Sequence, residues 1–286
     1  MSEIYRSEAG RQLLGRNYRA ALESWPVDNE HLRLPTPEGE TFVVASGPDH
    51  APPLVLIHGS GSNVTQWLDR IANLAEHFRV YAVDVIGEPG FSAPSRPSPA
   101  SDRYAVWMDA VLDALGLHGP VPIMGISLGS WLALDYATRR PDRVQRLALS
   151  CPPGLGPPKK GYLLKAVLLS PFGRWGRRRV VAGMLGPGLA GMGPAGADAV
   201  VEQVQLVSAN FRYRPGDLPV FDDDALRRLT MPVHVLVGEA DVMWDAAVTK
   251  QRLEALAPRA TVQMLPGVGH LVPARTAADL EFLTGP

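Results

Sequence analysis

The sequence predicts an α/β fold with a mostly parallel central sheet and helices on both faces. Short runs such as Pro53–Ile57 and Val121–Ile126 are apolar along their whole length, which is typical of strands buried on both sides. Segments with apolar residues at helical spacing alternate with these runs. The 286 residues, 46% of them hydrophobic and 20% charged, suffice for one large domain, or for one domain with an insertion.

The N-terminal part begins with a predicted helix. Residues 3–25 carry apolar side chains at roughly helical spacing, and Pro26 ends this helix, so residues 1–26 form an N-terminal helical segment. Two short strands are expected next, at 31–34 and 41–45. They are followed by the buried strand at 53–57, a helix at 64–78 and a strand at 80–85.

The alternation continues to residue 150, breaks, and resumes near residue 233. The first part predicts helices and strands at 103–117, 121–126, 128–139 and 144–150. Residues 152–219 are rich in Gly and Pro and show no clear strand, so they are expected to form an insertion over the C-terminal edge of the sheet. The core then comprises residues 1–151 and 220–286, and its last part predicts elements at 233–237, 245–256, 261–265 and 276–283.

Charge and cysteine content restrict the function classes. The net charge of −1 gives the whole chain no field that would attract nucleic acid or an anionic membrane, so neither is an expected partner. Cys151 is the only cysteine, which rules out an internal disulfide and fits a reducing cytoplasm. The N-terminal residues lack the apolar core of a signal peptide, and no apolar run is long enough to span a bilayer. We therefore expect a soluble cytoplasmic protein.

A candidate nucleophile lies in Gly125-Ile126-Ser127-Leu128-Gly129. The motif Gly-x-Ser-x-Gly is weak alone in a chain with 28 glycines, but here it falls between a predicted strand and a predicted helix. Such a turn is so tight that side chains two residues on either side of the serine would collide. It would raise the Ser127 hydroxyl above the sheet and direct the N–H of Leu128 toward developing negative charge. The alternative is an ordinary junction of small residues.

A serine hydroxyl needs a base, and the base needs a carboxylate. His270 follows the last predicted strand, in a loop with glycines on its N-terminal side. Glu239 and Asp241 follow the strand at 233–237, and Asp245 is a third acid nearby. Loops at the carboxyl ends of parallel strands share one edge of the sheet, so these groups are expected to meet.

The loop after strand 53–57 reads His58-Gly59-Ser60-Gly61-Ser62-Asn63. Its glycines let the backbone approach a substrate oxygen closely, so the N–H of Ser60 is the expected second oxyanion donor, with Gly61 as the alternative. The loop has no lysine and so does not fit a Walker phosphate-binding motif. His58 is expected to support the loop, and Asp84 to fix a neighbouring loop.

The sequence resembles the α/β-hydrolase superfamily. The matching pieces are HGSGSN (58–63), DVIGEPGFS (84–92), GISLG (125–129), GEAD (238–241) and GVGH (267–270), and the order Ser, Asp, His is that of this superfamily. The resemblance implies Ser127 as nucleophile, His270 as base, Asp241 as acid, and the N–H groups of Ser60 and Leu128 as oxyanion hole. It also implies a helical cap at 152–219.

DVIGEPGFSAPSRP and the N-terminal helix look like a carboxylesterase-like bacterial subgroup of that superfamily. Serine at the elbow argues against dehalogenases and epoxide hydrolases, which place Asp there. The expected activity is therefore hydrolysis of a small-molecule carboxylic ester through an acyl-enzyme, with no cofactor. No metal site is expected, because no His or carboxylate cluster has metal-ligand spacing.

Alternatives remain on the same fold. A thioesterase, a lactonase or a carbon–carbon bond hydrolase would use the same residues, and a receptor or cyclase would use the pocket without hydrolysis. A basic run in the insertion could dock an acyl-carrier protein, or it could be only a solvated surface. That run consists of Lys159, Lys160, Arg174 and Arg177–Arg179. Cys151 could line the pocket or simply pack in the core.

Overall fold

The computed structural model describes residues 4–159, 161, 168–169, 172–186, 189, 192–274 and 276–285. In these residues eight strands form one sheet, in the order β1-β2-β4-β3-β5-β6-β7-β8. The first two strands pair antiparallel, β2 pairs antiparallel with β4, and all pairs from β4 onward are parallel. The strands are β1 Asn29–Leu34, β2 Thr41–Ser46, β3 Pro53–Ile57, β4 Arg79–Val83, β5 Val121–Ile126, β6 Val144–Ser150, β7 Val233–Gly238 and β8 Ala260–Leu265. The predicted α/β class is confirmed.

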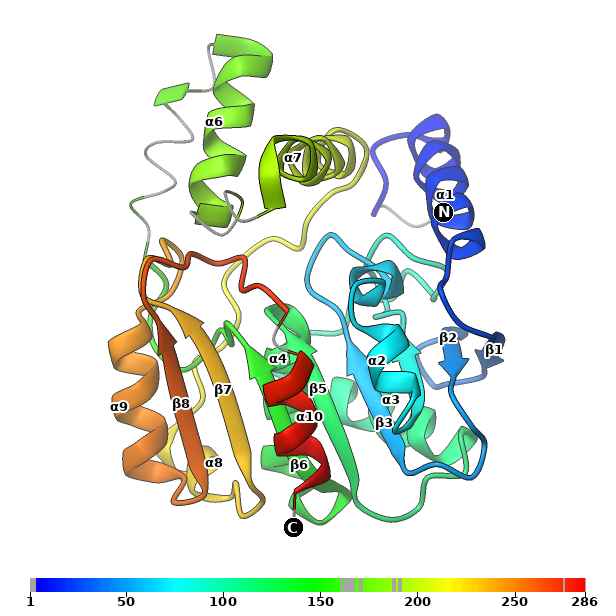
Figure 1. The fold of residues 1–286 in the computed structure, drawn as a ribbon, viewed down its shortest axis with the longest axis vertical. Helices are drawn as coiled ribbons and strands as arrows, with labels where there is room; N and C mark the ends of the chain where they lie inside the picture. Colours follow the sequence, from blue (N-terminus) through cyan, green and yellow to red (C-terminus); the bar gives the residue numbers. More distant parts are fainter. Residues whose placement is uncertain are drawn as a thin grey trace.

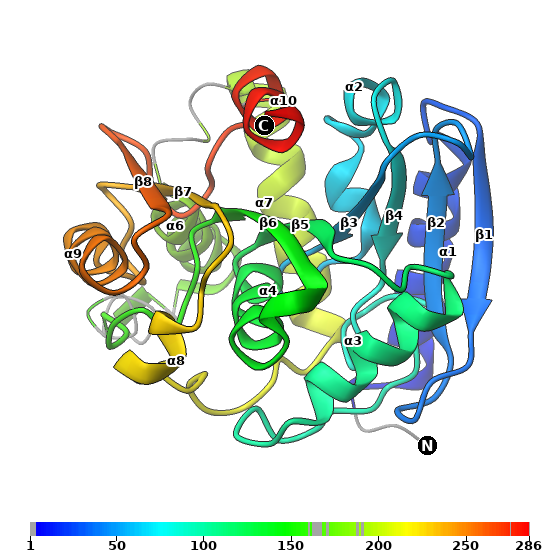
Figure 2. The ribbon, with the colours of Figure 1, turned by 90° about the horizontal axis from the view of Figure 1, so that it is seen from below.

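Side chains of the sheet alternate between two cores. Val55 and Ile57 of β3 belong to a core that also includes residues of α3, α4 and α9 on one face, whereas Leu54 and Leu56 belong to a core that includes residues of α2 and α10 on the other. Figure 2 shows α3 and α4 on one side of the sheet and α2 and α10 on the opposite side. The helices of the core are α1 Glu8–Glu23, α2 Ile71–Ala75, α3 Arg103–Ala114, α4 Leu128–Arg139, α8 Asp223–Arg227, α9 Ala246–Leu256 and α10 Thr276–Thr284. Burial on both faces is what made these strands continuously apolar.

Some predicted boundaries are wrong. The helix expected at 64–78 is a 3₁₀ helix, Val64–Trp67, followed by the short α2. Its apolar side chains keep a helical spacing and still face the sheet, but Asn63 caps the first turn and the chain turns again before α2 begins. The helix expected from residue 3 starts at Glu8, where the Ser7 side chain accepts a hydrogen bond from the N–H of Gly10. The short α8, capped by Asp222, was not predicted.

The described part of residues 152–219 includes two long helices that lie beyond the carboxyl ends of the strands (Figure 1). They are α6 Gly173–Leu185 and α7 Gly193–Asn210. A cavity of about 340 Å³ lies between them, with the Arg178–Asp198 ion pair and apolar side chains in its lining. Phe211, just after α7, packs with Ile4 and Leu14 at the N-terminal end of the chain. The N-terminal segment therefore contacts the insertion as well as the sheet. Among the described residues, no helix is both long enough and apolar enough to cross a bilayer.

Candidate active site

Ser127 lies between the end of β5 and the first residue of α4, with φ 51° and ψ −112°. A positive φ is costly for a residue with a side chain and is kept only where the surroundings enforce it. The two flanking glycines are part of this enforcement. A Cβ on Gly129 would lie 2.0 Å from the carbonyl oxygen of Ile57, and one on Gly125 would lie 2.6 Å from the carbonyl oxygen of Gly129. The predicted tight turn is therefore present, and it admits no side chain at either position.

The loops after β7 and β8 bring two further side chains to this serine. The Nε2 atom of His270 lies 3.0 Å from Ser127 Oγ, and its Nδ1 atom lies 2.8 Å from Asp241 Oδ2. The three residues thus form one continuous hydrogen-bonded array at the carboxyl edge of the sheet. This is the geometry of a nucleophile, a base and an orienting acid.

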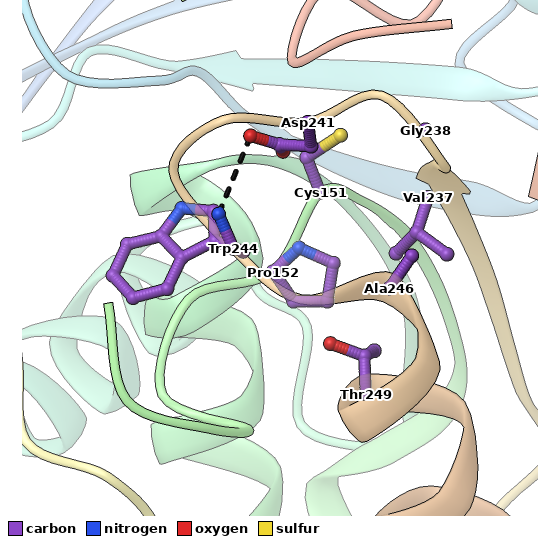
Figure 3. Close-up of a pocket in the computed structure, with 8 residues that line it drawn as sticks. All are labelled: Cys151, Pro152, Val237, Gly238, Asp241, Trp244, Ala246 and Thr249. Atoms are coloured by element: carbon purple, nitrogen blue, oxygen red, sulfur yellow. Dashed lines mark hydrogen bonds between the residues drawn. The ribbon is translucent and has the colours of Figure 1, made fainter. Parts of the chain in front are cut away.

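The Asp241 carboxylate is held in place by backbone groups. Its Oδ1 accepts hydrogen bonds from the N–H of Met243 at 2.7 Å and from the N–H of Trp244 at 3.3 Å, the second of which is drawn in Figure 3. This leaves Oδ2 for His270. Burial raises the pKa of Asp241. The hydrogen bond to His270, the charge of His270 and the two backbone N–H groups lower this pKa by more, so the net shift is downward. The acid is therefore ionised when it faces the imidazole.

The imidazole of His270 experiences opposing effects. Burial disfavours the imidazolium and lowers the pKa of His270, while the hydrogen bond to Asp241 and the nearby Cys151 raise it, with a net upward shift. A raised pKa makes His270 a stronger base toward the Ser127 hydroxyl. Its side chain is 15% exposed, so it faces the site rather than the core.

Cys151 belongs to the surroundings of this array. It follows β6, is buried and has φ 47°, and it lines a small pocket with Trp244 and the end of β7 (Figure 3). Its Sγ, a carboxylate oxygen of Asp241 and a ring nitrogen of His270 lie within 4.8 Å of one another. These groups could hold a metal ion by residue type, but both ring nitrogens of His270 are already hydrogen-bonded within the array. The chemistry available here is proton transfer.

Neither rival acid reaches the histidine. Asp245 is the N-cap of α9 and accepts from the N–H groups of two residues in its first turn. Glu239 is exposed. Of the three predicted carboxylates, the structure brings Asp241 alone to His270.

The loop after β3 lies beside the serine. A Cβ on Gly59 would lie 3.6 Å from Ser127 Cβ. The N–H of Gly61, the alternative oxyanion donor, instead donates to Glu88 Oε2 at 2.6 Å. On the other side, Leu128 opens α4, and the first N–H groups of a helix have no acceptor within it.

Glu88, which was not predicted from the sequence as a site residue, lies against this loop. The side chain is 1% exposed, and its Oε2 also accepts from the Ser60 hydroxyl at 3.4 Å. Its Oε1 is buried without a hydrogen-bond partner among the described residues. Burial raises the pKa of Glu88 to about 7, although the Gly61 N–H and the charges of Arg96 and Arg214 act in the opposite direction. The only sequence signal was an acid within the segment DVIGEPGFS.

His58 and Asp84 support the neighbouring loops, as predicted. His58 is fully buried, its Nε2 accepts from the N–H of Val85 at 2.9 Å, and burial lowers its pKa to about 4. Asp84 accepts from the Tyr18 hydroxyl and from the backbone N–H groups of Val64 and Phe91. Neither side chain contacts Ser127 in the described part of the chain, so they shape the site without entering it.

Known proteins resemble this chain in sequence and in fold. The family model described as the alpha/beta hydrolase family matches residues 54–281. The carboxylesterase YbfK of Bacillus subtilis (strain 168) is 30% identical over 89% of this chain and 86% of its own length. The crystal structure of carboxylesterase CesB (YbfK) superposes with a TM-score of 0.82 at 26% identity, covering 97% of this chain and 99% of that one. The naproxen esterase of Bacillus subtilis gives 0.79 at 28% identity, covering 96% of both chains.

Proposed function

This chain belongs to the alpha/beta hydrolase family, and we propose that it is a serine hydrolase that cleaves small-molecule carboxylic esters through an acyl-enzyme. The observation that carries the proposal is the continuous array from Ser127 Oγ through His270 to Asp241 on a strained turn. Strain of this kind is retained at functional sites because the surrounding structure enforces it. The carboxylesterases among the relatives support the choice of an ester.

In the acylation step, His270 Nε2 accepts the proton of Ser127 as Oγ attacks the ester carbonyl carbon. Asp241 keeps the Nδ1 proton of His270 in place and stabilises the imidazolium that forms. The N–H groups of Ser60 and Leu128 donate to the oxyanion, and each such donor is typically worth about 3 kcal/mol.

Collapse of the tetrahedral intermediate breaks the bond to the alcohol oxygen, and His270 gives its proton to the leaving alcohol. Water then attacks the acyl-serine carbonyl while His270 takes a proton from it. The carboxylic acid leaves, and Ser127 regains its hydroxyl proton from His270.

We assign Glu88 as a positioning residue for the oxyanion loop. Glu88 accepts a hydrogen bond from the N–H of Gly61 and so holds the peptide that joins Ser60 to Gly61. We infer that this contact fixes the direction in which the Ser60 N–H points. Replacing Glu88 with glutamine keeps an acceptor oxygen, whereas alanine removes it. We therefore expect Glu88→Ala to lower kcat about 10- to 100-fold with little change in KM, and Glu88→Gln to restore most of that loss.

Residues 152–219 are proposed to act as the cap that selects the substrate. The carbonyl of Leu185, the last residue of α6, accepts a hydrogen bond at 3.1 Å from the N–H of Leu271, next to His270. Gly186 and Gly269 approach so closely that a Cβ on either would lie 2.7 Å from the other's Cα. The end of α6 thus lies against the loop that carries the base.

The test is a panel of p-nitrophenyl esters of increasing acyl length, together with matched acyl-thioesters and lactones. The proposal expects turnover of esters by the wild type and a loss of kcat of about 10⁴-fold or more in Ser127→Ala. Faster turnover of thioesters or lactones would move the substrate class to those bonds. Ligand binding without turnover would favour a receptor or cyclase.

A further inference from the structure

The cap segment has an unusual charge composition. Between Pro152 and Ala197 the sequence has no Asp or Glu, but it has seven basic residues: Lys159, Lys160, Lys165, Arg174, Arg177, Arg178 and Arg179. The whole-chain charge of −1 therefore combines +7 on this segment with −8 on the rest of the chain. A net charge near zero, which predicts no attraction to membranes, conceals a strongly cationic segment.

The same segment exposes large apolar side chains. Leu168, Phe172 and Trp175 are 63%, 61% and 55% exposed, which makes them the most exposed large hydrophobic residues of the described chain. The rings of Phe172 and Trp175 meet edge to face with centroids 5.9 Å apart, and the guanidinium of Arg179 lies 5.3 Å from the Trp175 ring. Clustered exposed hydrophobic residues of this kind mark an interaction site.

The cluster lies at the end of α6 that points away from the core. Val181 and Leu185, further along the helix, pack with Val201 of α7, whereas Trp175 in the first turn remains exposed. Figure 1 shows α6 standing beyond the strand ends, above the loop that follows β8. The exposed cluster and the loop of His270 are therefore connected by one helix.

We propose that these residues dock the protein onto an anionic phospholipid surface. The α6 surface is defined as Leu168, Phe172, Trp175, Arg178 and Arg179. Aromatic rings beside arginines are the composition of helices that lie at a membrane interface, where rings sit at headgroup depth and guanidinium groups pair with phosphates. The absence of acidic residues in 152–197 removes the repulsion that acidic headgroups would otherwise exert.

A membrane fits these observations better than an acidic carrier protein. A bilayer accepts protruding side chains without a matching pocket, whereas a protein partner needs a complementary surface for each of them. Arg178 is paired with Asp198, and the basic residues are spread along the sequence from Lys159 to Arg179. A diffuse positive field suits a diffuse negative surface.

The consequence for catalysis rests on the proposed function, although docking itself does not. An ester dissolved in a bilayer is concentrated at the surface to which α6 is bound, and the other end of α6 contacts the loop of the proposed base. Hydrolysis of a lipophilic ester should therefore rise when it is presented in anionic vesicles.

The experiment is co-sedimentation of the 286-residue protein with vesicles. One set contains phosphatidylcholine alone and the other is rich in phosphatidylglycerol. We expect binding to the anionic vesicles, little binding to the neutral ones, and weaker binding at high salt because surface charges are screened. The double variant Phe172→Ser/Trp175→Ser should bind about tenfold more weakly, and Arg178→Gln/Arg179→Gln should weaken the preference for anionic lipid.

Val220→Ser is the matched control, because Val220 is a 47% exposed hydrophobic residue outside the α6 surface. It should bind vesicles like the wild type and hydrolyse a water-soluble ester at the wild-type rate. Equal binding to both vesicle types, unaltered binding by the double variants, or binding to an acidic acyl-carrier protein without binding to vesicles would overturn the proposal. Failure of wild-type ester hydrolysis would instead count against the proposed function alone.

Discussion

Glu88→Gln should remove a loss of stability that the wild type undergoes as pH rises. In the wild type the buried carboxyl has a pKa of about 7, whereas in the unfolded chain it takes the ordinary value of 4.5. Between these values the native state keeps a proton that the unfolded state has lost, so stability falls as pH rises through this window. The full difference corresponds to about 3 kcal/mol, and most of it falls between pH 5 and pH 8.

Glutamine has no such proton and its amide oxygen can still accept from Gly61. Relative to the wild type, the free energy of unfolding of Glu88→Gln should therefore be about 2 to 3 kcal/mol larger at pH 8 than at pH 5, so the variant gains relative stability as pH rises. Urea unfolding of both proteins at the two pH values measures this difference. Glu23→Gln removes an exposed carboxyl at the end of α1 and should show no comparable change. If the relative stability of Glu88→Gln were the same at both pH values, the reasoning about a poorly paired buried carboxyl would be refuted.

Three shorter predictions concern the elbow, the acid and a buried carboxylate. Gly129→Ala places a Cβ 2.0 Å from the Ile57 carbonyl oxygen and should lose about 3 kcal/mol or more, so a thermal unfolding midpoint like the wild type's would contradict the packing. Asp241→Asn should lower kcat about 10⁴-fold. It should also move the acid limb of the kcat/KM profile to lower pH, because Asp241 raises the pKa of His270. An acid limb that does not shift in a pH-rate series would exclude this role. Asp84→Ala leaves three buried donors without an acceptor and should lower the free energy of unfolding, measured in urea, by about 3 kcal/mol or more. A loss below about 1 kcal/mol would contradict the hydrogen bonds described.

The elbow was predictable because local pattern and tertiary environment agree there. The predicted bounds of β5, α4 and β6 match the structure, since strands buried on both faces are continuously apolar and the glycines of the elbow mark the junction between strand and helix. His270 and Asp241 could be placed for the same reason, because each follows a strand whose end reaches the same edge.

The insertion could not be predicted in the same way. In α6 basic residues surround the apolar ones, and Trp175 is exposed, so the helix shows no clean buried stripe in sequence. Its short connections contain Gly and Pro, which hide helix ends from pattern analysis. Lys160 of the predicted basic run lies outside the described residues, as do the side chains of Arg174 and Arg177.

Glu88 shows a different limit. Nothing in its own segment indicates burial, because its partner Gly61 is 27 residues away and reaches it only when the loops after β3 and β4 fold together. The interrupted helix at 64–78 has a similar cause. Its apolar spacing is helical, but the side-chain cap of Asn63 and the packing of the loop decide where the helical turns stop.

The most direct test of the central claim is the intact mass of the protein after incubation with a fluorophosphonate. The account predicts one covalent adduct on the wild type and none on Ser127→Ala, because His270 and Asp241 activate this hydroxyl alone. An unmodified wild type that is folded, or an adduct that persists in Ser127→Ala, would contradict the assignment of Ser127 as the nucleophile.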